Sequence, residues 1–312
     1  MKIFQERKII GKGGYSTIYL DERLGKQIVC KLYKNQSTSN DIKLQLFREI
    51  KFLKLLKHPN IIELIDIEMN ENTIEILQSY YPKTLQMKIN QFHSSYQSII
   101  SQKNYQNQSN QTEMKIIQNE TIQQQVNEIK HIIHQIHEVF QYLHSNYIVH
   151  RDIKPDNFLL DSDNTIKLID FGNAYQIKDN EYISAINCTP NYCPPECTFA
   201  TRVPPFSIDI FQIGCVVFEM LTNCQFLSVS SDYQLISFLQ NVYQFNYGVL
   251  FANPSIQSLP ENLPLSEQYL NDFWKDFPFE LTDKIKTYLN ITLNGNPFKR
   301  LSMKELQSDY PL

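Results

Sequence analysis

The pattern of hydrophobic residues changes near residue 81, and this change constrains the fold more than any other feature of the chain. Before it, short runs rich in β-branched and aromatic residues are separated by glycine-rich or charged turns, which predicts antiparallel strands. These runs cover residues 8–13, 16–22, 26–33, 61–69 and 73–81. Between them, apolar residues recur at spacings of three and four over residues 41–58, which predicts an amphipathic helix that Pro59 ends.

The second part of the chain has a mostly helical pattern, which is clear from Val126 onward. The 312 residues, of which 42% are hydrophobic, are enough for one large domain or for two lobes. The two patterns together predict an α+β protein. Its small β-rich part would cover residues 1–81, and its larger, mainly helical part would cover residues 82–312.

A tract rich in Gln, Asn and Ser extends from about Gln91 to Gln125. It has few apolar anchors and no firm period, so it cannot bury enough surface to offset its ordering entropy. We therefore expect a flexible surface insertion at about residues 94–115. The alternative is an ordered extension of polar helix.

Charge and hydropathy exclude several classes of function. Lys and Arg number 29 against 33 Asp and Glu, a formal net charge of −4, so no basic excess is available for nucleic acid or an anionic membrane. No apolar stretch approaches the roughly 18 residues of a membrane span, and the first residues lack an apolar signal region. We expect an intracellular protein, cytoplasmic and/or nuclear, whose six cysteines are thiols.

Three glycines in a short loop, Gly11, Gly13 and Gly14, lie between two predicted strands together with Lys12 and Ser16. This context differs from a dinucleotide-binding fingerprint, whose glycines lead into a helix. Because glycines allow backbone amides to approach a phosphate closely, the loop suits phosphate binding. An ordinary glycine-rich hairpin is the alternative.

Lys31 lies in the apolar run Ile28–Lys31. An inward-facing lysine needs an anionic partner, because an unpaired buried charge is costly. Glu49, inside the predicted helix, can supply that partner. Without further support, a surface lysine and a surface glutamate explain the same pattern.

A cluster of chemically active residues supplies that support. The sequence HRDIKPDN covers residues His150–Asn157, and thirteen residues after Asn157 comes Asp170-Phe171-Gly172. With these motifs, in the same order and spacing, the chain resembles the eukaryotic protein kinases from about Phe4 to Tyr310. The resemblance implies a bilobal kinase fold, with a small β-rich N-lobe that carries one main helix and a larger, mainly helical C-lobe.

The resemblance also implies roles in phosphoryl transfer, with ATP and Mg²⁺ as cofactors. Asp152 would be the catalytic base and Lys154 would contact the γ-phosphate. Lys31 would hold the α- and β-phosphates, oriented by its ion pair with Glu49. The implied Mg²⁺ ligands are Asn157 and Asp170. The residues implied to bind the nucleotide are Gly11, Lys12, Gly13, Gly14, Ser16, Ile18, Val29, Lys31, Ser79 and Tyr81.

Two positions near the implied adenine site stand out. Val29 occupies a place where the family usually has alanine, so two additional methyl groups narrow the slot for the base. Gln78, by position, lies at the back of the nucleotide pocket, with Ser79, Tyr80 and Tyr81 as the hinge.

Other residues indicate the substrate class and the subgroup. Lys154, two residues after the implied base, and Thr189 resemble the serine/threonine kinases rather than the tyrosine kinases. Within that type, residues 45–67 and 213–235 most resemble the cyclin-dependent and related kinases. Such a kinase implies a protein substrate.

Further residues match the family's scaffold and its regulation. Glu196 and Arg300 resemble a buried ion pair, and Asp209 resembles the helix residue that anchors the catalytic loop. Arg151 matches the residue by which many kinases bind a phosphorylated activation segment, in which Ser184 is our candidate phosphosite. Activity without phosphorylation is the alternative.

The resemblance leaves the partners and the catalytic state open. An activating kinase or a cyclin-like subunit would fit the subgroup. A pseudokinase, which would bind nucleotide as a scaffold without catalysis, is the alternative function. The presence of Lys31, Asp152, Asn157 and Asp170 favours catalysis.

Overall fold

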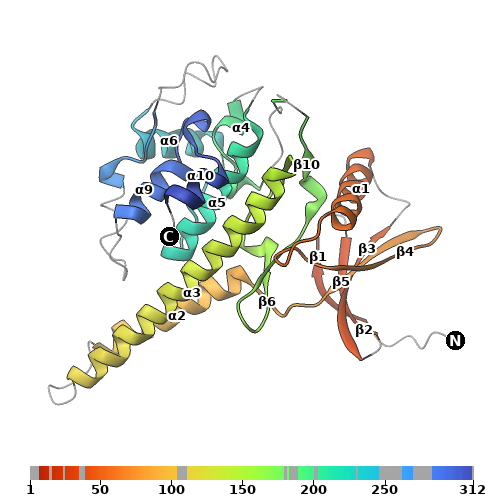
Figure 1. The fold of residues 1–312 in the computed structure, drawn as a ribbon, viewed down its shortest axis with the longest axis horizontal. Coiled ribbons are helices and arrows are strands. Elements are labelled where there is room, and N and C mark those ends of the chain that lie inside the picture. Colours follow the sequence, from red (N-terminus) through yellow and green to blue (C-terminus); the bar gives the residue numbers. More distant parts are fainter. Residues whose placement is uncertain are drawn as a thin grey trace.

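The computed structural model divides into two lobes (Figure 1). In the described part of the chain, a five-stranded sheet and the helix α1 form the N-lobe, and helices dominate the C-lobe. The described residues are 7–13, 16–23, 25–34, 39–103, 111–178, 181–182, 189–199, 203–229, 231–245, 262–269 and 283–310. The α+β bilobal fold is confirmed, while the division at residue 81 stays a prediction.

The N-lobe sheet has the strand order β1-β2-β3-β5-β4, and every neighbouring pair is antiparallel. Its strands are β1 (Lys8–Lys12), β2 (Ser16–Arg23), β3 (Lys26–Lys34), β4 (Leu64–Met69) and β5 (Thr73–Ser79). Each strand coincides with a run predicted from the sequence. The glycine loop therefore joins β1 to β2 as a hairpin, which is the context that the sequence predicts.

Alternation along β3 separates its side chains into two sets. Ile28 and Cys30 pack with Leu77 in a small cluster on one face of the sheet. Because successive side chains of a strand point to opposite faces, Lys31 and Tyr33 lie on the other face, where both line the cavity between the lobes. The sheet thus places a cationic and a phenolic side chain side by side on the functional face.

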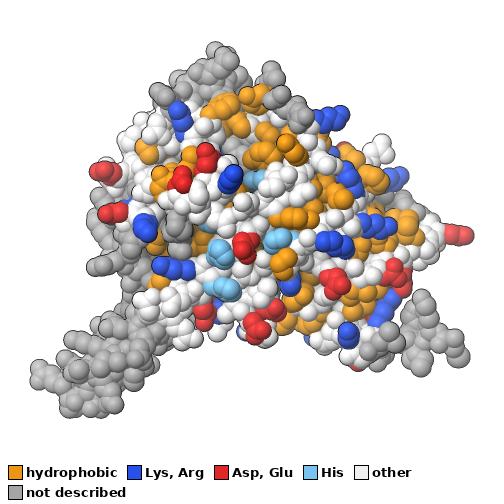
Figure 2. Space-filling view, in the orientation of Figure 1, with side chains coloured by type: hydrophobic (Ala, Val, Ile, Leu, Met, Phe, Trp, Pro, Cys, Tyr) orange, Lys and Arg blue, Asp and Glu red, His pale blue; other side chains and the backbone are white. Residues whose placement is uncertain are grey.

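The helix α1 (Asn40–Leu55) matches the predicted amphipathic helix. Its buried residues are Ile42, Leu46, Glu49, Phe52 and Leu53. Glu49, 1% exposed, is thus a carboxylate on an otherwise apolar face. The other side of α1 leaves Leu44, Phe47 and Leu55 exposed. Figure 2 shows hydrophobic side chains interspersed with lysine and arginine side chains over the N-lobe.

The C-lobe is built from long helices and short strands. Its helices are α2 (Leu85–Lys103), α3 (Gln111–Ser145), α4 (Glu196–Phe199), α5 (Pro205–Thr222), α6 (Asp232–Tyr243), α9 (Asp283–Thr292) and α10 (Met303–Asp309). Its strands are β6 (Lys83–Thr84), β7 (Ile148–Val149), β8 (Phe158–Leu160), β9 (Ile166–Leu168) and β10 (Tyr175–Gln176). Its 3₁₀ turns are η2 (Pro155–Asn157), η3 (Phe171–Asn173), η4 (Pro190–Tyr192) and η6 (Pro297–Lys299). The three-stranded sheet β6-β8-β9 and the pair β7-β10 hold the loops that carry the site.

The helix α5 forms the centre of the C-lobe, and every residue from Ser207 to Thr222 is buried. It is the one helix in the described ranges that is long and apolar enough to cross a membrane, but 89% of that stretch is buried inside the protein. This burial is typical of a core helix that is surrounded by other elements of its own fold.

Within the insertion expected at about residues 94–115, the residues that the structure describes are helical. The helix α2 continues through residues 94–103, and α3 already begins at Gln111, so the alternative of a helical extension holds there. Residues 104–110 lie outside the described part of the chain. In Figure 1 the two helices run side by side away from the C-lobe. Gln is a good helix former, so a Gln-rich composition alone does not indicate an irregular segment.

Candidate active site

A cavity of about 570 Å³ lies between the lobes. The predicted site residues that line it are Gly13, Ser16, Ile18, Val29, Lys31, Glu49, Ser79, Tyr81, Asn157 and Asp170. Gly11 and Lys12 belong to β1 but do not line it, and Gly14 lies outside the described residues. The sequence analysis missed other lining residues, among them Ile62, Leu159 and Ile169, which are apolar and carry no motif.

Lys31 is held by carboxylates from two other elements. Its Nζ donates to the two carboxylate oxygens of Glu49 at 2.9 and 3.0 Å and lies 3.4 Å from Oδ1 of Asp170. Burial alone would lower the pKa of Lys31, but the charges of Glu49 and Asp170 raise it well above its ordinary value. Lys31 is therefore a fixed cation at the wall of the cavity.

Asp152 lies next to the cavity and is 6% exposed. The hydroxyl of Thr189 donates to its Oδ1 at 2.6 Å, and Nζ of Lys154 donates to its Oδ2 at 3.1 Å. The amide of Asn157 contacts the same carboxylate at 3.2 Å and also donates to the backbone carbonyl of Asp152 at 2.7 Å. These contacts fix the orientation of a carboxylate that can accept a proton.

The loop that carries Asp152 is anchored to α5. The backbone amides of His150 and Arg151 each donate to Asp209 at 2.9 Å, and the amide of Ile153 donates to Gln212 at 3.0 Å. Both acceptors are fully buried. Because the backbone amides of a buried loop must find partners, α5 determines the path of the loop.

Two residues of the site adopt positive φ angles, Arg151 at 69° and Asp170 at 64°. Non-glycine residues in this region cost roughly 1–3 kcal/mol each, and such strain concentrates at functional sites. Burial would raise the pKa of the Asp170 carboxyl, but the nearby charge of Lys31 lowers it below its ordinary value. Asp170 is thus held as a carboxylate beside the cavity.

The inner end of the cavity suits a flat, partly polar group. Val29 lies opposite Gln78 across the β3-β5 pair, and both line the cavity. Gln78 is 7% exposed, and its buried Nε2 has no hydrogen-bond partner in the structure. A buried donor without a partner is costly unless a ligand or water accepts from it. Apolar walls with one such donor fit a nucleobase.

The phosphate end of the cavity fits Mg²⁺ and phosphate. Asp170 and Asn157 both line it, and oxygen atoms are the ligands that Mg²⁺ prefers. Because Nδ2 of Asn157 already donates to Asp152, its amide oxygen is the atom left for a metal. At Gly13, a Cβ atom would lie 3.0 Å from the hydroxyl of Ser16, so the loop has little room for a side chain there.

Arg151 points to the start of the activation segment. Its Nε donates to the carbonyl of Asn173 at 2.6 Å, and its guanidinium lies over the ring of Tyr175. Burial lowers the pKa of Arg151 to about 10, and the nearby charge of Arg48 adds to this effect. Two adjacent guanidinium groups would attract an anion. Ser184, the candidate phosphosite, lies outside the described residues.

The expectation that all six cysteines are thiols does not hold. Cys193, at the end of η4, is disulfide-bonded. Among the described residues, Cys30, Cys197, Cys215 and Cys224 carry thiols that are not in disulfide bonds. Cys188 lies outside the described residues, and among the described ones no group of three or more His, Cys, Asp or Glu side chains could hold a metal.

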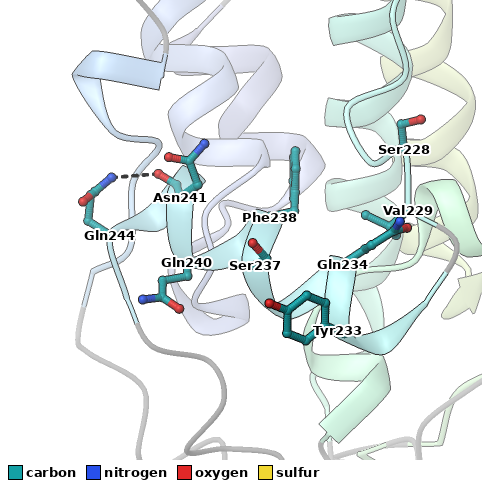
Figure 3. Close-up of a pocket in the computed structure, with 9 residues that line it drawn as sticks. All are labelled: Ser228, Val229, Tyr233, Gln234, Ser237, Phe238, Gln240, Asn241 and Gln244. Carbon is teal, nitrogen blue, oxygen red and sulfur yellow. Dashed lines mark hydrogen bonds between the residues drawn. The ribbon is translucent and has the colours of Figure 1, made fainter.

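A second hollow, of about 780 Å³, lies along α6 (Figure 3). Its described lining contains serine, glutamine and asparagine side chains with Tyr233 and Phe238, and no ionisable group other than the tyrosine. Although it is larger than the cavity between the lobes, it lacks the paired charges that acid-base or phosphate chemistry requires. The chemically competent site is therefore the one between the lobes.

The description of the fold and site agrees with comparisons to known proteins. The protein kinase domain family matches residues 4–310, so the chain belongs to that family. Among its relatives is the serine/threonine-protein kinase crk1 of Schizosaccharomyces pombe, 26% identical over 230 residues, which are 73% of this chain and 60% of crk1. Another is the serine/threonine-protein kinase KIN28 of Saccharomyces cerevisiae, 26% identical over 232 residues, 73% of this chain and 67% of KIN28. The predicted family is confirmed.

Proposed function

We propose that the chain is a protein kinase that uses ATP and Mg²⁺ to phosphorylate serine and threonine hydroxyls of protein substrates. One observation carries the proposal. Lys31, Asn157 and Asp170 come from three separate segments and line one cavity. Asp152 is hydrogen-bonded to Asn157 at the edge of that cavity. This set of residues matches what phosphoryl transfer requires.

The residues on the N-lobe side would hold the nucleotide. Lys31 presents a fixed ammonium group to phosphate oxygens, and Gly13 and Ser16, which flank the turn between β1 and β2, line the same cavity. Asn157 and Asp170 would hold the metal. When bound, ATP supplies the phosphoryl group and Mg²⁺ offsets its negative charge.

The residues on the C-lobe side would hold the acceptor. Asp152 would accept or orient the proton of the substrate hydroxyl, because its carboxylate is fixed by Thr189. The ammonium group of Lys154 lies 3.1 Å from the same carboxylate, so it can stabilise negative charge that develops next to the base. A serine or threonine side chain of a protein substrate would present its hydroxyl to Asp152 in this arrangement.

We also propose a partner for α1 and a location for the protein. Leu44, Phe47 and Leu55 are 46%, 65% and 54% exposed on the outer face of α1, which suits a cyclin-like activating subunit. An activating kinase would act on the activation segment, and Arg151, whose Nε donates to the carbonyl of Asn173, would bind the added phosphate. The protein would act inside the cell, in the cytoplasm and/or the nucleus.

The decisive experiment measures transfer of labelled γ-phosphate from ATP to myelin basic protein in the presence of Mg²⁺. The wild type should label the acceptor, and Asp170→Asn should lower the rate at least 100-fold. Asp163→Asn, the same change at an exposed turn residue, should match the wild type. Equal background labelling by the wild type and Asp170→Asn, while the wild type binds ATP, would establish the pseudokinase function instead.

The partner is tested separately. Phe47→Asp should remove the gain in activity that a cyclin-like subunit gives to the purified chain. Phe298→Asp places the same change on an exposed phenylalanine of the C-lobe, so its gain should equal that of the wild type. A gain that survives Phe47→Asp would place the subunit elsewhere.

A further inference from the structure

Glu49 has a second partner that the ion pair with Lys31 does not explain. The hydroxyl of Tyr33 donates to Oε2 of Glu49 at 2.6 Å, and both side chains are buried, at 7% and 1% exposure. Tyr33 follows Lys31 by two residues on β3, so the strand presents both donors to the same carboxylate. The carboxylate of Glu49 is therefore bound by three hydrogen bonds from one strand.

Tyr33 is a donor that does not titrate under ordinary conditions. Burial raises the pKa of the Tyr33 hydroxyl, and the negative charge of Glu49 raises it further. The group is therefore retained as an O–H donor to the carboxylate. A short bond from a neutral donor to a carboxylate is stronger than a bond between two neutral groups.

This bond depends on the position of α1. Glu49 lies on α1 and Tyr33 lies on β3, so the two groups meet only while the helix is packed against the sheet. If α1 moved outward, both the carboxylate and the hydroxyl would lose a buried partner. A contact that exists in only one of two states shifts the equilibrium toward that state by its own free energy.

Two other side chains of α1, one on each side of Glu49 in the chain, tie the helix to the C-lobe. Nε2 of Gln45 donates to Oδ1 of Asn173 at 3.3 Å, and Nζ of Lys51 donates to Oε1 of Gln176 at 3.0 Å. Asn173 and Gln176 follow Asp170 closely in the chain. These two contacts are weaker or more exposed than the bond from Tyr33, so Tyr33 contributes more than they do to the free energy that holds α1 in place.

We propose that Tyr33 is a positioning residue that holds α1 against the sheet, so that Glu49 meets Lys31 without an activating subunit. This inference rests on the proposed kinase function, since it concerns how the lysine is oriented for phosphate. Tyr33 acts through the carboxylate of Glu49, to which its hydroxyl donates. An activating subunit then adds to a helix that is already in place.

The test compares Tyr33→Phe with Tyr192→Phe. Tyr192 is the matched control, because its hydroxyl donates to Glu219 at 2.6 Å in an equally buried pair of the C-lobe. Hydrogen exchange of residues 40–55 is measured in the nucleotide-free protein, and the KM for ATP is measured in parallel. Tyr33→Phe should speed exchange in this helix about fivefold and raise the KM about fivefold. This factor corresponds to the net free energy of one hydrogen bond.

Each outcome decides the proposal. Tyr192→Phe should leave the exchange of residues 40–55 and the KM for ATP at wild-type values. Equal exchange in Tyr33→Phe and the wild type, or the same acceleration in both variants, would overturn the role of Tyr33. Faster exchange in Tyr33→Phe alone, in a chain that transfers no phosphate, would retain the positioning role and reject the proposed function.

Discussion

Among the buried ion pairs of the described residues, one in each lobe invites comparison, because the two are built for different purposes. Arg300 and Glu196 are each fully enclosed by the C-lobe, with no exposed side-chain surface. Arg300 also donates to the carbonyls of Asn294 and Ser207. The pair of Lys31 and Glu49 is similarly buried, but Lys31 is 14% exposed and faces the cavity. We call Glu196 and Arg300 the closed pair, because the protein surrounds it on all sides. Lys31 and Glu49 are the open pair, because Lys31 faces the cavity.

The two pairs differ in whether a side chain reaches a cavity, and this determines whether the pair can bind a ligand. A buried pair whose hydrogen bonds are all made within the protein can only contribute to folding. A pair that retains donor capacity toward a cavity can bind a ligand, and it depends on elements that are able to move apart. Lys31 and Glu49 link a strand to a helix of the N-lobe, and Lys31 also contacts Asp170 of the C-lobe across the cavity.

The largest expected effect comes from breaking the closed pair. Glu196→Ala leaves the guanidinium of Arg300 buried without its anionic partner, so the free energy of unfolding should fall by about 3–5 kcal/mol. Chemical denaturation followed by circular dichroism measures this change. A loss below about 1 kcal/mol would show that the C-lobe does not depend on the pair.

The C-lobe core should also be sensitive to acid. His137 of α3 is 3% exposed and lies 2.7 Å from the hydroxyl of Tyr288, and burial lowers its pKa to about 4, with a contribution from His134. Since the unfolded chain has a pKa near 6.5, it binds the proton more readily than the folded chain. Stability is therefore complete above about pH 6.5 and declines as the pH falls toward 4, by up to about 3 kcal/mol.

The acid dependence is measured by denaturation at a series of pH values. In His137→Gln, the slope of the unfolding free energy between pH 6.5 and 4 should be smaller than in the wild type. His134→Gln serves as the control, because His134 lies 58% exposed on the same helix and should leave most of the slope. An unchanged slope in His137→Gln would assign the acid dependence to other groups.

Replacing the basic residue of each pair by the other basic residue type keeps the charge and tests the geometry of each pair. Lys31→Arg keeps the charge of the open pair but misplaces the donor, so phosphoryl transfer should fall about 10- to 100-fold while stability changes little. Arg300→Lys removes the two-point contact of the closed pair, so it should cost about 2 kcal/mol of stability. Rates and denaturation curves are measured on both variants. The opposite pattern would mean that the roles of the pairs are reversed.

The smallest effect is expected from an exposed pair of the N-lobe. Arg23 contacts Glu68 on the outer sheet, with side chains 31% and 34% exposed. Arg23→Gln should lower the free energy of unfolding by no more than about 1 kcal/mol, and the loss should shrink at high salt. A larger loss that is independent of salt would indicate that this pair is as important as the buried ones.

Much of the fold follows from local patterns in the sequence. The alternation over residues 26–33 and the period over residues 41–58 each reflect one buried face, so β3 and α1 were predictable. Lys31 and Glu49 could be paired because a charge on a buried face needs a partner, and the structure contains that ion pair at 2.9 Å.

Other features could not be predicted, for physical reasons. The helices α2 and α3 were missed at residues 94–103 and 111–115, because composition reports the average polarity of a segment and not the helix propensity of its glutamines. The contact of Tyr33 with Glu49 was missed because a tyrosine is an ordinary strand residue. The sequence did contain one signal of this contact: Tyr33 lies two residues after Lys31, a spacing that places both side chains on one face of the strand.

The most direct test of the account compares Asp152→Asn with the wild type. Nucleotide affinity is measured by calorimetry with Mg-ATP, and phosphoryl transfer to a serine peptide is measured under single-turnover conditions. If the open pair binds the nucleotide and Asp152 acts on the acceptor, the affinity should stay within about twofold while transfer falls by roughly 10²–10⁴. Transfer at the wild-type rate in Asp152→Asn would contradict the assignment of this cavity as the catalytic centre.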